Sequence, residues 1–188
     1  MTDRLRIALA QLNPTVGAIA QNLALAKSTL AEAAGQGADI LLFSELFLTG
    51  SFPDALLFKP RFIADAMAAA EDFARATAGT SVSAIMPTVW REGGKLFNAV
   101  IVCEAGEITA RRYKRELPND DIFYEKRYFE RADLQEPVTI KGVSIGIPIC
   151  EDIWHPDVCA HLVDQGARLL LCPNGSPYWR NKQATRYK

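Results

Sequence analysis

The sequence predicts an α/β fold made of layers of helices and strands. Segments whose apolar residues recur at helical spacing alternate with short apolar runs that are typical of buried strands. Glycines close the helical segments, and turn residues separate the strands. The order helix, Gly-Ala, apolar strand, polar residue occurs twice, at 31–45 and at 161–174, as a weak internal echo. These three observations favour a sheet with helices packed against it.

The first half of the chain is predicted to alternate strands and helices. Residues 5–14 form a strand that stops at Asn-Pro, and 18–37 form a helix that closes on two glycines. Residues 38–45 are a continuous apolar run, which is consistent with a strand buried on both faces. A loop at 48–54 leads to a second amphipathic helix at 62–79.

The second half is predicted to contain more strands than helices. The expected elements are a strand at 81–90 with its turn at 91–95, a hairpin at 96–114 around Ala105-Gly106, a polar and aromatic loop at 115–129, two short strands within 136–150 joined by a Lys-Gly turn, a helix at 155–167 and a buried strand at 168–174.

Composition excludes several classes of protein. The chain has 188 residues, the size of one domain, and its 49% hydrophobic content allows a globular core. The net charge of −1 provides no basic field for a nucleic acid or an anionic membrane. The N-terminus lacks the apolar region of a signal peptide, and no apolar run approaches the roughly 20 residues of a membrane span. A cytoplasmic protein is expected.

The four cysteines suggest free thiols and no metal site. A cytosolic chain of this size keeps its cysteines reduced. Two cysteines and two histidines, residue types that bind zinc, lie close together in the sequence. The spacing of Cys150, His155, Cys159 and His161, however, matches no paired zinc-ligand pattern. We therefore expect no bound metal.

Polar residues follow the predicted strands at the points where those strands end. These are Glu45, Lys114, Cys150 and Asn174. In layered α/β sheets, functional groups gather at the carboxyl ends of strands. A carboxylate, an ammonium group and a thiol at three such ends indicate a candidate site.

The chemistry of these three groups suits acyl transfer from an amide. A thiol with a pKa of about 8.5 is mostly protonated at neutral pH and needs a base. Glu45, beside apolar residues and partly desolvated, is the candidate base. Lys114 and the backbone N–H that follows Cys150 are the candidate oxyanion donors. Thiolate attack, loss of ammonia and hydrolysis of a thioester would complete the reaction.

Each of the three residues also has an ordinary structural interpretation. Glu45 could be a charge at a strand end that faces solvent. Lys114 lies in the run RRYKRE, which is typical of a solvated surface, and Cys150 could be a small core residue. The residues alone leave these alternatives open.

The candidate residues lie in three motifs, which read LLFSELFLTGSFP, RRYKRELPNDDIFYEKRYF and GIPICEDIWHP. These motifs resemble those of the nitrilase, or carbon–nitrogen hydrolase, superfamily, with Ser44 where the family usually has proline. The resemblance extends over the whole chain in order. It implies an αββα sandwich with Glu45 as base, Lys114 as oxyanion stabiliser and Cys150 as nucleophile.

A narrower resemblance is to the glutaminase domains of glutamine-dependent NAD synthetases. It rests on YKRELPNDDIFYEKRYF, ICEDIW and NGSPYW, with Gly175 in place of the family's usual alanine. This resemblance implies that Glu125 helps to orient the lysine and the substrate. It also implies that Ser176 contacts the head group of glutamine.

The acids Glu151 and Asp152 directly follow Cys150. We expect the chain to turn sharply at Cys150 to present the thiol, much as a nucleophile elbow does. The two acids would then lie outside the core in the first turn of a helix, where negative charge complements the helix dipole. The same helix N-terminus is expected to lower the pKa of the thiol.

The resemblance implies that residues 1–188 are an incomplete glutaminase domain, a sandwich truncated at its C-terminal side, with an ATP-dependent synthetase domain downstream. No glycine-rich phosphate-binding loop is found here, so ATP, magnesium and deamido-NAD are expected outside these residues. The expected substrate is glutamine, and a homo-oligomer is expected because missing strands would expose sheet edges. The alternatives are a free-standing amidase of the same superfamily and a non-catalytic fragment that acts by association.

Overall fold

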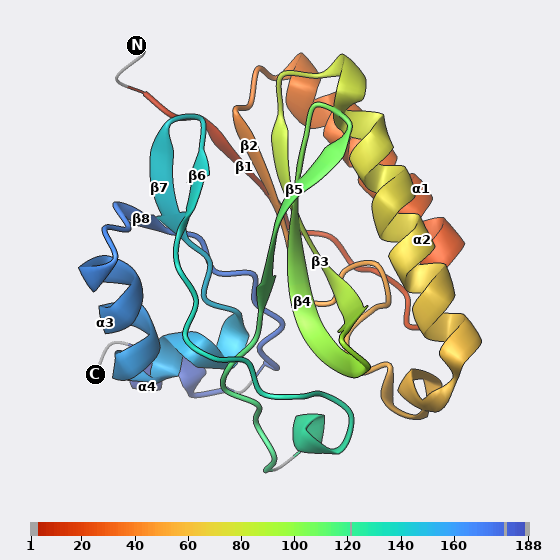
Figure 1. The fold of residues 1–188 in the computed structure, drawn as a ribbon, viewed down its shortest axis with the longest axis vertical. Helices are drawn as coiled ribbons and strands as arrows, with labels where there is room; N and C mark the ends of the chain where they lie inside the picture. Colours follow the sequence, from red (N-terminus) through yellow and green to blue (C-terminus); the bar gives the residue numbers. More distant parts are fainter. Residues whose placement is uncertain (1–3, 121, 179, 187–188) are drawn as a thin grey trace.

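The computed structural model of the chain describes residues 4–120, 122–178 and 180–186 (Figure 1). The strands are β1 (Ile7–Ala10), β2 (Ile40–Phe43), β3 (Ser83–Glu92), β4 (Lys95–Glu104), β5 (Glu107–Tyr113), β6 (Val138–Ile140), β7 (Val143–Gly146) and β8 (Leu169–Leu170). The α-helices are α1 (Ile19–Gly35), α2 (Pro60–Ala76), α3 (Pro156–Asp164) and α4 (Lys182–Arg186). Short 3-10 helices are η1 (Asp54–Phe58), η2 (Thr77–Gly79), η3 (Glu125–Arg127) and η4 (Cys150–Trp154).

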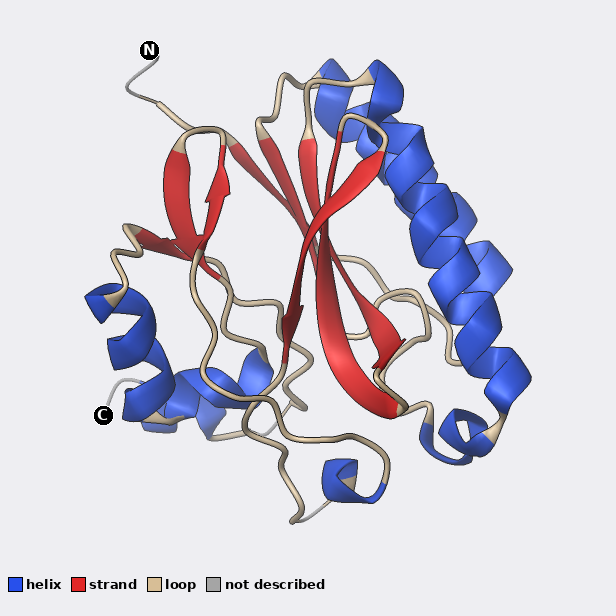
Figure 2. Ribbon diagram, in the orientation of Figure 1, coloured by secondary structure: helices blue, strands red, loops and turns tan. Residues whose placement is uncertain are grey.

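The strands form two sheets. The larger sheet has the order β1-β2-β3-β4-β5, with β1, β2 and β3 parallel and β3, β4 and β5 antiparallel. The smaller sheet has the order β6-β7-β8. Helices α1 and α2 cover the outer face of the larger sheet, and α3 lies beyond the smaller sheet (Figure 2). The predicted αββα sandwich is confirmed.

Strand β2 shows how the layers are held together. Its four residues are all buried, as predicted for a strand covered on both faces. Leu41 and Phe43 belong to the core against α1 and α2, where Phe43 makes an edge-to-face contact with Phe73 at 5.6 Å. Ile40 and Leu42 point the other way and join the core between the two sheets. The period-2 alternation of a strand therefore places one β2 side chain in each core in turn.

The predicted hairpin turns are also confirmed. Ala105 and Gly106 join β4 to β5 with φ values of 50° and 94°, and Lys141 and Gly142 join β6 to β7 with φ values of 52° and 77°. Positive φ at both central residues is the requirement of the type I′ turn, whose twist matches that of the flanking strands.

The strands predicted within 136–150 and at 168–174 are shorter than expected. β7 ends at Gly146 and β8 at Leu170, so Cys150 begins a 3-10 helix instead of ending a strand. β8 lies at the edge of the smaller sheet, and Leu170 is 37% exposed, so the prediction of a buried strand was wrong. Beyond the two strands the chains stay connected, because the Leu171 N–H donates to Gly146 O and the Cys150 N–H donates to Pro173 O, each at 2.9 Å. The sequence also did not predict the 3-10 helices or α4.

Within the described ranges, the helices are too short or too polar for any of them to cross a membrane.

Candidate active site

The structure brings together three residues that lie far apart in the sequence. Glu45 follows β2 after one residue, Lys114 directly follows β5, and Cys150 opens η4. All three are buried, with exposed fractions of 4%, 1% and 4%. The interpretations that place Glu45 and Lys114 on a solvated surface are therefore wrong.

Lys114 connects two carboxylates. Its Nζ donates to Glu45 Oε1 and to Glu125 Oε1, each at 2.7 Å. Burial by itself lowers the pKa of Lys114, but the two carboxylates outweigh this effect and the net direction is upward. The lysine is therefore a fixed positive charge and not a proton donor at neutral pH.

The Glu45 carboxylate is oriented so that its two oxygens have different surroundings. Oε1 accepts from Lys114 and, at 2.9 Å, from Asn98 Nδ2. Oε2 faces Gly175, where an added Cβ would lie only 3.0 Å away. The negative charge of the carboxylate also acts on the Cys150 thiol and raises its pKa. One oxygen is thus held in place, and the other is available to accept a proton.

Cys150 has an unusual backbone conformation. Its φ is 47°, in the left-handed region that favours glycine. The Cys150 N–H donates to Pro173 O at 2.9 Å, and Sγ lies 3.6 Å from Asn174 Oδ1. Such strain persists only where the surroundings enforce it, and it is typical of functional sites. The sharp turn expected at this residue is present.

The expectation of a lowered thiol pKa was wrong. Burial raises the pKa of Cys150, and the charge of Glu45 raises it further. The Lys114 ammonium and the Gly175 N–H lower it, but only in part. Desolvation prevails because η4 is a single short turn and the sulfur is nearly enclosed. The resting group is a neutral thiol that must give its proton to a base.

Glu125 is the second carboxylate on Lys114. Burial raises the pKa of Glu125 to about 7, the Lys114 ammonium acts in the opposite direction, and the charge of Glu45 adds to the rise. Two carboxylates share one ammonium, so the group carries a net negative charge when both are ionised. A proton on Glu125 relieves that charge.

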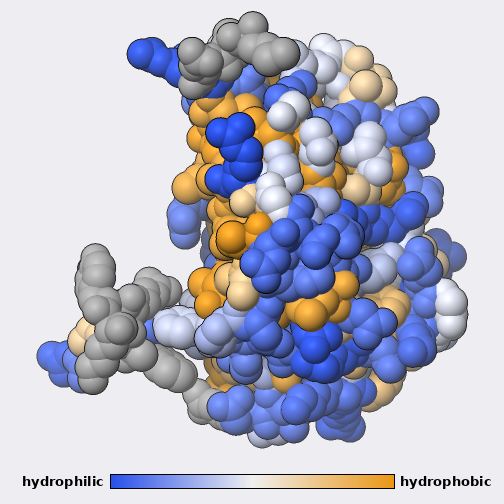
Figure 3. Space-filling view, turned by 60° about the vertical axis from the view of Figure 1, so that its left-hand side comes forward, coloured by the Kyte–Doolittle hydropathy of each residue, from blue (hydrophilic) through white to orange (hydrophobic). Residues whose placement is uncertain are grey.

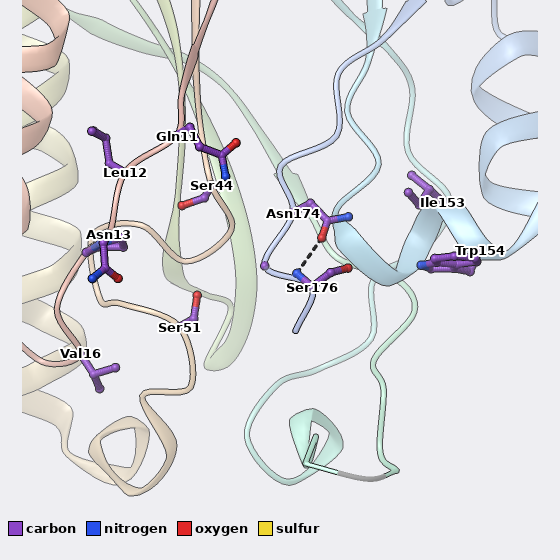
Figure 4. Close-up of a pocket in the computed structure, with 12 residues that line it drawn as sticks. Gln11, Leu12, Asn13, Val16, Ser44, Ser51, Ile153, Trp154, Asn174 and Ser176 are labelled. Atoms are coloured by element: carbon purple, nitrogen blue, oxygen red, sulfur yellow. Dashed lines mark hydrogen bonds between the residues drawn. The ribbon is translucent and has the colours of Figure 1, made fainter. Parts of the chain in front are cut away.

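Ser176 lies in the wall of a groove. Its N–H donates to Asn174 Oδ1 at 2.7 Å (Figure 4). The groove has a volume of about 980 Å³. One wall is formed by residues 11–14 with Val16, Ser44 and Ser51, and the other by Ile153, Trp154 and residues 174–176 (Figure 4). Two residues in its wall contact the candidate catalytic residues: Asn174 Oδ1 lies 3.6 Å from Cys150 Sγ, and an added Cβ on Gly175 would lie 3.0 Å from Glu45 Oε2. A second cavity of about 30 Å³ contacts Glu45 and Glu125 directly and is also lined by Phe123 and Tyr128.

A model of the carbon-nitrogen hydrolase family matches residues 6–187. The chain belongs to this family. Among the residues that the structure describes in this carbon-nitrogen hydrolase, no group of three or more His, Cys, Asp or Glu side chains could hold a metal ion.

The most similar relatives include several synthetases. The hydrolase is 44% identical over 183 residues to the glutamine-dependent NAD(+) synthetase of Rhodobacter capsulatus, covering 97% of this chain and 33% of that protein. The synthetase of Thermotoga maritima is 36% identical over 185 residues. The chain spans about a third of the length of these relatives.

Solved structures share the fold. The glutamine-dependent NAD+ synthetase of Acinetobacter baumannii, in complex with ADP, superposes with a TM-score of 0.88 at 27% identity, covering 97% of this chain and 34% of that one. An amidase from Nesterenkonia sp. AN1 superposes with a TM-score of 0.82 at 24% identity and shares the fold, with this hydrolase covering 70% of its chain.

Two residues of the hydrolase's site were missed by sequence reasoning. Asn98, 1% exposed, orients Glu45, and the available signal was an amide inside the apolar strand 96–103. Asp152 is 2% exposed, so its expected place outside the core was wrong. It is tolerated in the interior because three backbone N–H groups donate to it, from Ile149, Arg115 and Glu116. No local pattern in the sequence showed these partners.

Proposed function

We propose that this carbon-nitrogen hydrolase hydrolyses glutamine through a thioester on Cys150 and supplies ammonia to an ATP-dependent amidation of deamido-NAD. The observation that carries the proposal is the buried Glu45–Lys114–Glu125 arrangement beside a strained cysteine. The 44% identity to a glutamine-dependent NAD(+) synthetase supports glutamine as the substrate.

The first half of the reaction breaks the C–N bond. Cys150 Sγ attacks the side-chain amide carbon of glutamine, and the thiol proton passes to Glu45 Oε2. The Lys114 ammonium and the backbone N–H of Glu151 stabilise the oxyanion. Glu45 then gives the proton to the leaving nitrogen, ammonia departs, and a thioester remains on Cys150.

The second half restores the enzyme. Water attacks the thioester carbon while Glu45 accepts one of its protons. The second tetrahedral intermediate collapses, the C–S bond breaks, and Cys150 regains a proton as glutamate leaves. Glu125 holds Lys114 in place throughout by its 2.7 Å hydrogen bond. Ser176, in the groove wall, is the proposed contact for the glutamine head group.

The remaining parts of the proposal concern the larger protein. ATP, magnesium and deamido-NAD bind outside residues 1–188, because these residues contain no phosphate-binding loop and the synthetase relatives are about three times as long. All four cysteines are free thiols, which supports a reducing compartment such as the cytosol.

The test is a Cys150→Ala variant of the full-length protein, assayed for NAD formation with glutamine and with ammonium salts. Glutamine-dependent synthesis should be abolished because the nucleophile is gone. Synthesis from ammonium should stay largely intact because it bypasses the thioester. Cys159→Ala, a half-buried cysteine on α3, is the matched control and should retain both activities.

Two outcomes would contradict the proposal. Unchanged synthesis from glutamine in Cys150→Ala would show that the nucleophile lies elsewhere. An active glutaminase that supplies no amidation of deamido-NAD would leave the hydrolytic chemistry in place and remove the proposed purpose.

A further inference from the structure

We propose that Asp152 is a positioning residue that fixes the Lys114 backbone relative to the Cys150 backbone. The inference rests on the proposed function, since it assigns how two groups of that site are held in register. Asp152 follows the nucleophile by two residues, yet its carboxylate contacts the segment that carries the lysine.

The carboxylate joins two segments that are far apart in the sequence. Oδ1 accepts from the backbone N–H groups of Glu116 at 2.7 Å and Arg115 at 3.2 Å. Oδ2 accepts from the Ile149 N–H at 2.9 Å. The first two donors directly follow Lys114, and the third directly precedes Cys150. One rigid, planar group therefore sets the spacing of the two chains.

On the cysteine side, this contact supports a strained backbone. The Ile149 and Asp152 main chains also meet directly, because the Asp152 N–H donates to Ile149 O at 3.1 Å. Together with the bond from the Cys150 N–H to Pro173 O, these contacts enclose the residue whose φ is 47°. A non-glycine residue keeps such a φ only when its neighbours enforce it.

On the lysine side, the hydrogen bonds to Asp152 help to hold the backbone of residues 114–116 in place. The Lys114 N–H donates to Asn98 O at 2.8 Å, and Lys114 O accepts from the Ala132 N–H at 3.3 Å. Asp152 fixes the next two peptide groups. With its backbone held on both sides, the buried lysine can direct Nζ at a constant position beside the thiol.

The arrangement also explains why a carboxylate is needed at 152. Burial raises the pKa of Asp152, which opposes ionisation, while the three N–H donors and the Lys114 charge favour the ionised form. An ionised carboxylate accepts bonds on both oxygens. An asparagine has nearly the same shape, but its NH₂ group cannot accept, so at least one of the three N–H groups would lose its partner.

The experiment compares Asp152→Asn with wild type in the full-length protein. Asp164→Asn, an exposed aspartate at the end of α3, is the matched control. Three quantities are measured: kcat and KM for glutamine hydrolysis, the rate of Cys150 modification by a glutamine-like diazoketone, and the melting temperature. The diazoketone rate reports the geometry of the thiol without a complete catalytic cycle.

The proposal expects a fall of about 100-fold in kcat for Asp152→Asn, because a displacement of roughly 1 Å can have that effect. The diazoketone rate should fall in parallel, with KM nearly unchanged and the protein still folded. A variant with the kcat and diazoketone rate of wild type and only a lower melting temperature would show a merely structural role and overturn the inference.

Asp152→Glu keeps the inference testable if Asp152→Asn does not fold. It retains the charge but moves the carboxylate by one methylene, so a folded Asp152→Glu should also lose kcat and diazoketone rate. Wild-type values for both would overturn the inference. Glutamine hydrolysis that survives in Cys150→Ala would instead refute the proposed function, and the two failures are therefore distinguishable.

Discussion

At the scale of single residues, burial determines the electrostatic environment of the candidate catalytic side chains. The run RRYKRE is typical of a surface, yet Lys114 is 1% exposed and its neighbour on β5, Tyr113, donates its N–H to Gln135 Oε1 at 2.6 Å. A lysine cannot stay charged in such a place without partners, and Glu45 and Glu125 supply them. The burial of one cation thus accounts for the two acids beside it.

Asn98 provides a residue-scale prediction. Its Nδ2 donates to Glu45, the proposed base, while its Oδ1 is buried without a hydrogen-bond partner among the described residues. Asn98→Leu should therefore lower kcat for the proposed glutamine hydrolysis by roughly 10-fold or more, as expected for one lost hydrogen bond to a charged group. Steady-state kinetics of wild type and Asn98→Leu, at equal concentrations of folded protein, would measure the change in kcat. An unchanged kcat would show that Lys114 alone orients Glu45.

The two carboxylates on Lys114 predict a pH dependence of stability. Glu125 has a reference pKa of 4.5 and a folded-state pKa of about 7, so between these values the folded protein binds more protons than the unfolded chain. Its contribution to the free energy of unfolding is complete below about pH 4.5 and is lost as the pH rises through about 7, with a slope of at most ~1.4 kcal/mol per pH unit.

Glu125→Gln removes this titration. The difference in free energy of unfolding between wild type and Glu125→Gln should therefore fall between pH 4.5 and 7, as measured by urea denaturation at several pH values. Parallel stability curves for the two proteins across this range would argue that Glu125 has no raised pKa in the folded state.

At the scale of elements, the site depends on how closely β7, β8 and α3 approach each other. Gly146 ends β7, and a Cβ placed there would lie 2.6 Å from Leu170 Cδ2 and 3.1 Å from Leu162 Cδ1. The Gly146 carbonyl accepts from the Leu171 N–H at 2.9 Å, just before the chain turns toward Cys150. A glycine at this position therefore allows β7 to pack closely against β8 and α3, four residues before Cys150.

Gly146→Ala should destabilise the protein by about 1–3 kcal/mol, the usual cost of overpacking. Gly35→Ala, at the end of α1, is the control, since no atom lies within 4 Å of its added Cβ. The control should be neutral or slightly stabilising, because it reduces the conformational freedom of the unfolded chain. Urea denaturation measures both, and equal stability of the two variants would refute the close approach.

At the scale of the whole molecule, the sandwich leaves apolar surface at one margin. Leu9, on the edge strand β1, is 68% exposed, although the neighbouring strand β2 is fully buried. Figure 3 shows hydrophobic surface along the margin where the outline is hollowed. Leu9 lines a cavity of about 140 Å³ that also contacts Cys172 and Asn174, near the site. An exposed sheet edge with apolar side chains favours association.

We therefore expect the 188-residue chain to associate with copies of itself through this margin. Leu9→Thr keeps a strand-forming residue and removes apolar surface, so it should weaken the association. Sedimentation velocity over a concentration series measures the effect. A wild-type chain that stays monomeric throughout the series would contradict the expectation of a homo-oligomer for these residues.

The sequence by itself predicted the order of the helices and strands and the polar residues that follow the strands. Periodicity located α1, α2 and α3 and the strands of the larger sheet, because these patterns are local and each turn has its own chemistry, as at Ala105-Gly106. Residue type and position identified Glu45, Lys114 and Cys150 as a candidate group. The resemblance of the motifs around them to a known family predicts the αββα sandwich.

Tertiary structure alone decided the environment of each group. The burial that raises the thiol pKa, the bond from Asn98 to Glu45 and the interior position of Asp152 all depend on partners from distant segments. The hydrogen bond from the Cys150 N–H to Pro173 O, beyond the ends of β7 and β8, likewise joins segments that are distant in the sequence. A local pattern carries no information about which distant N–H or carboxylate will face a side chain, so desolvation and hydrogen-bond partners follow only from the packed fold.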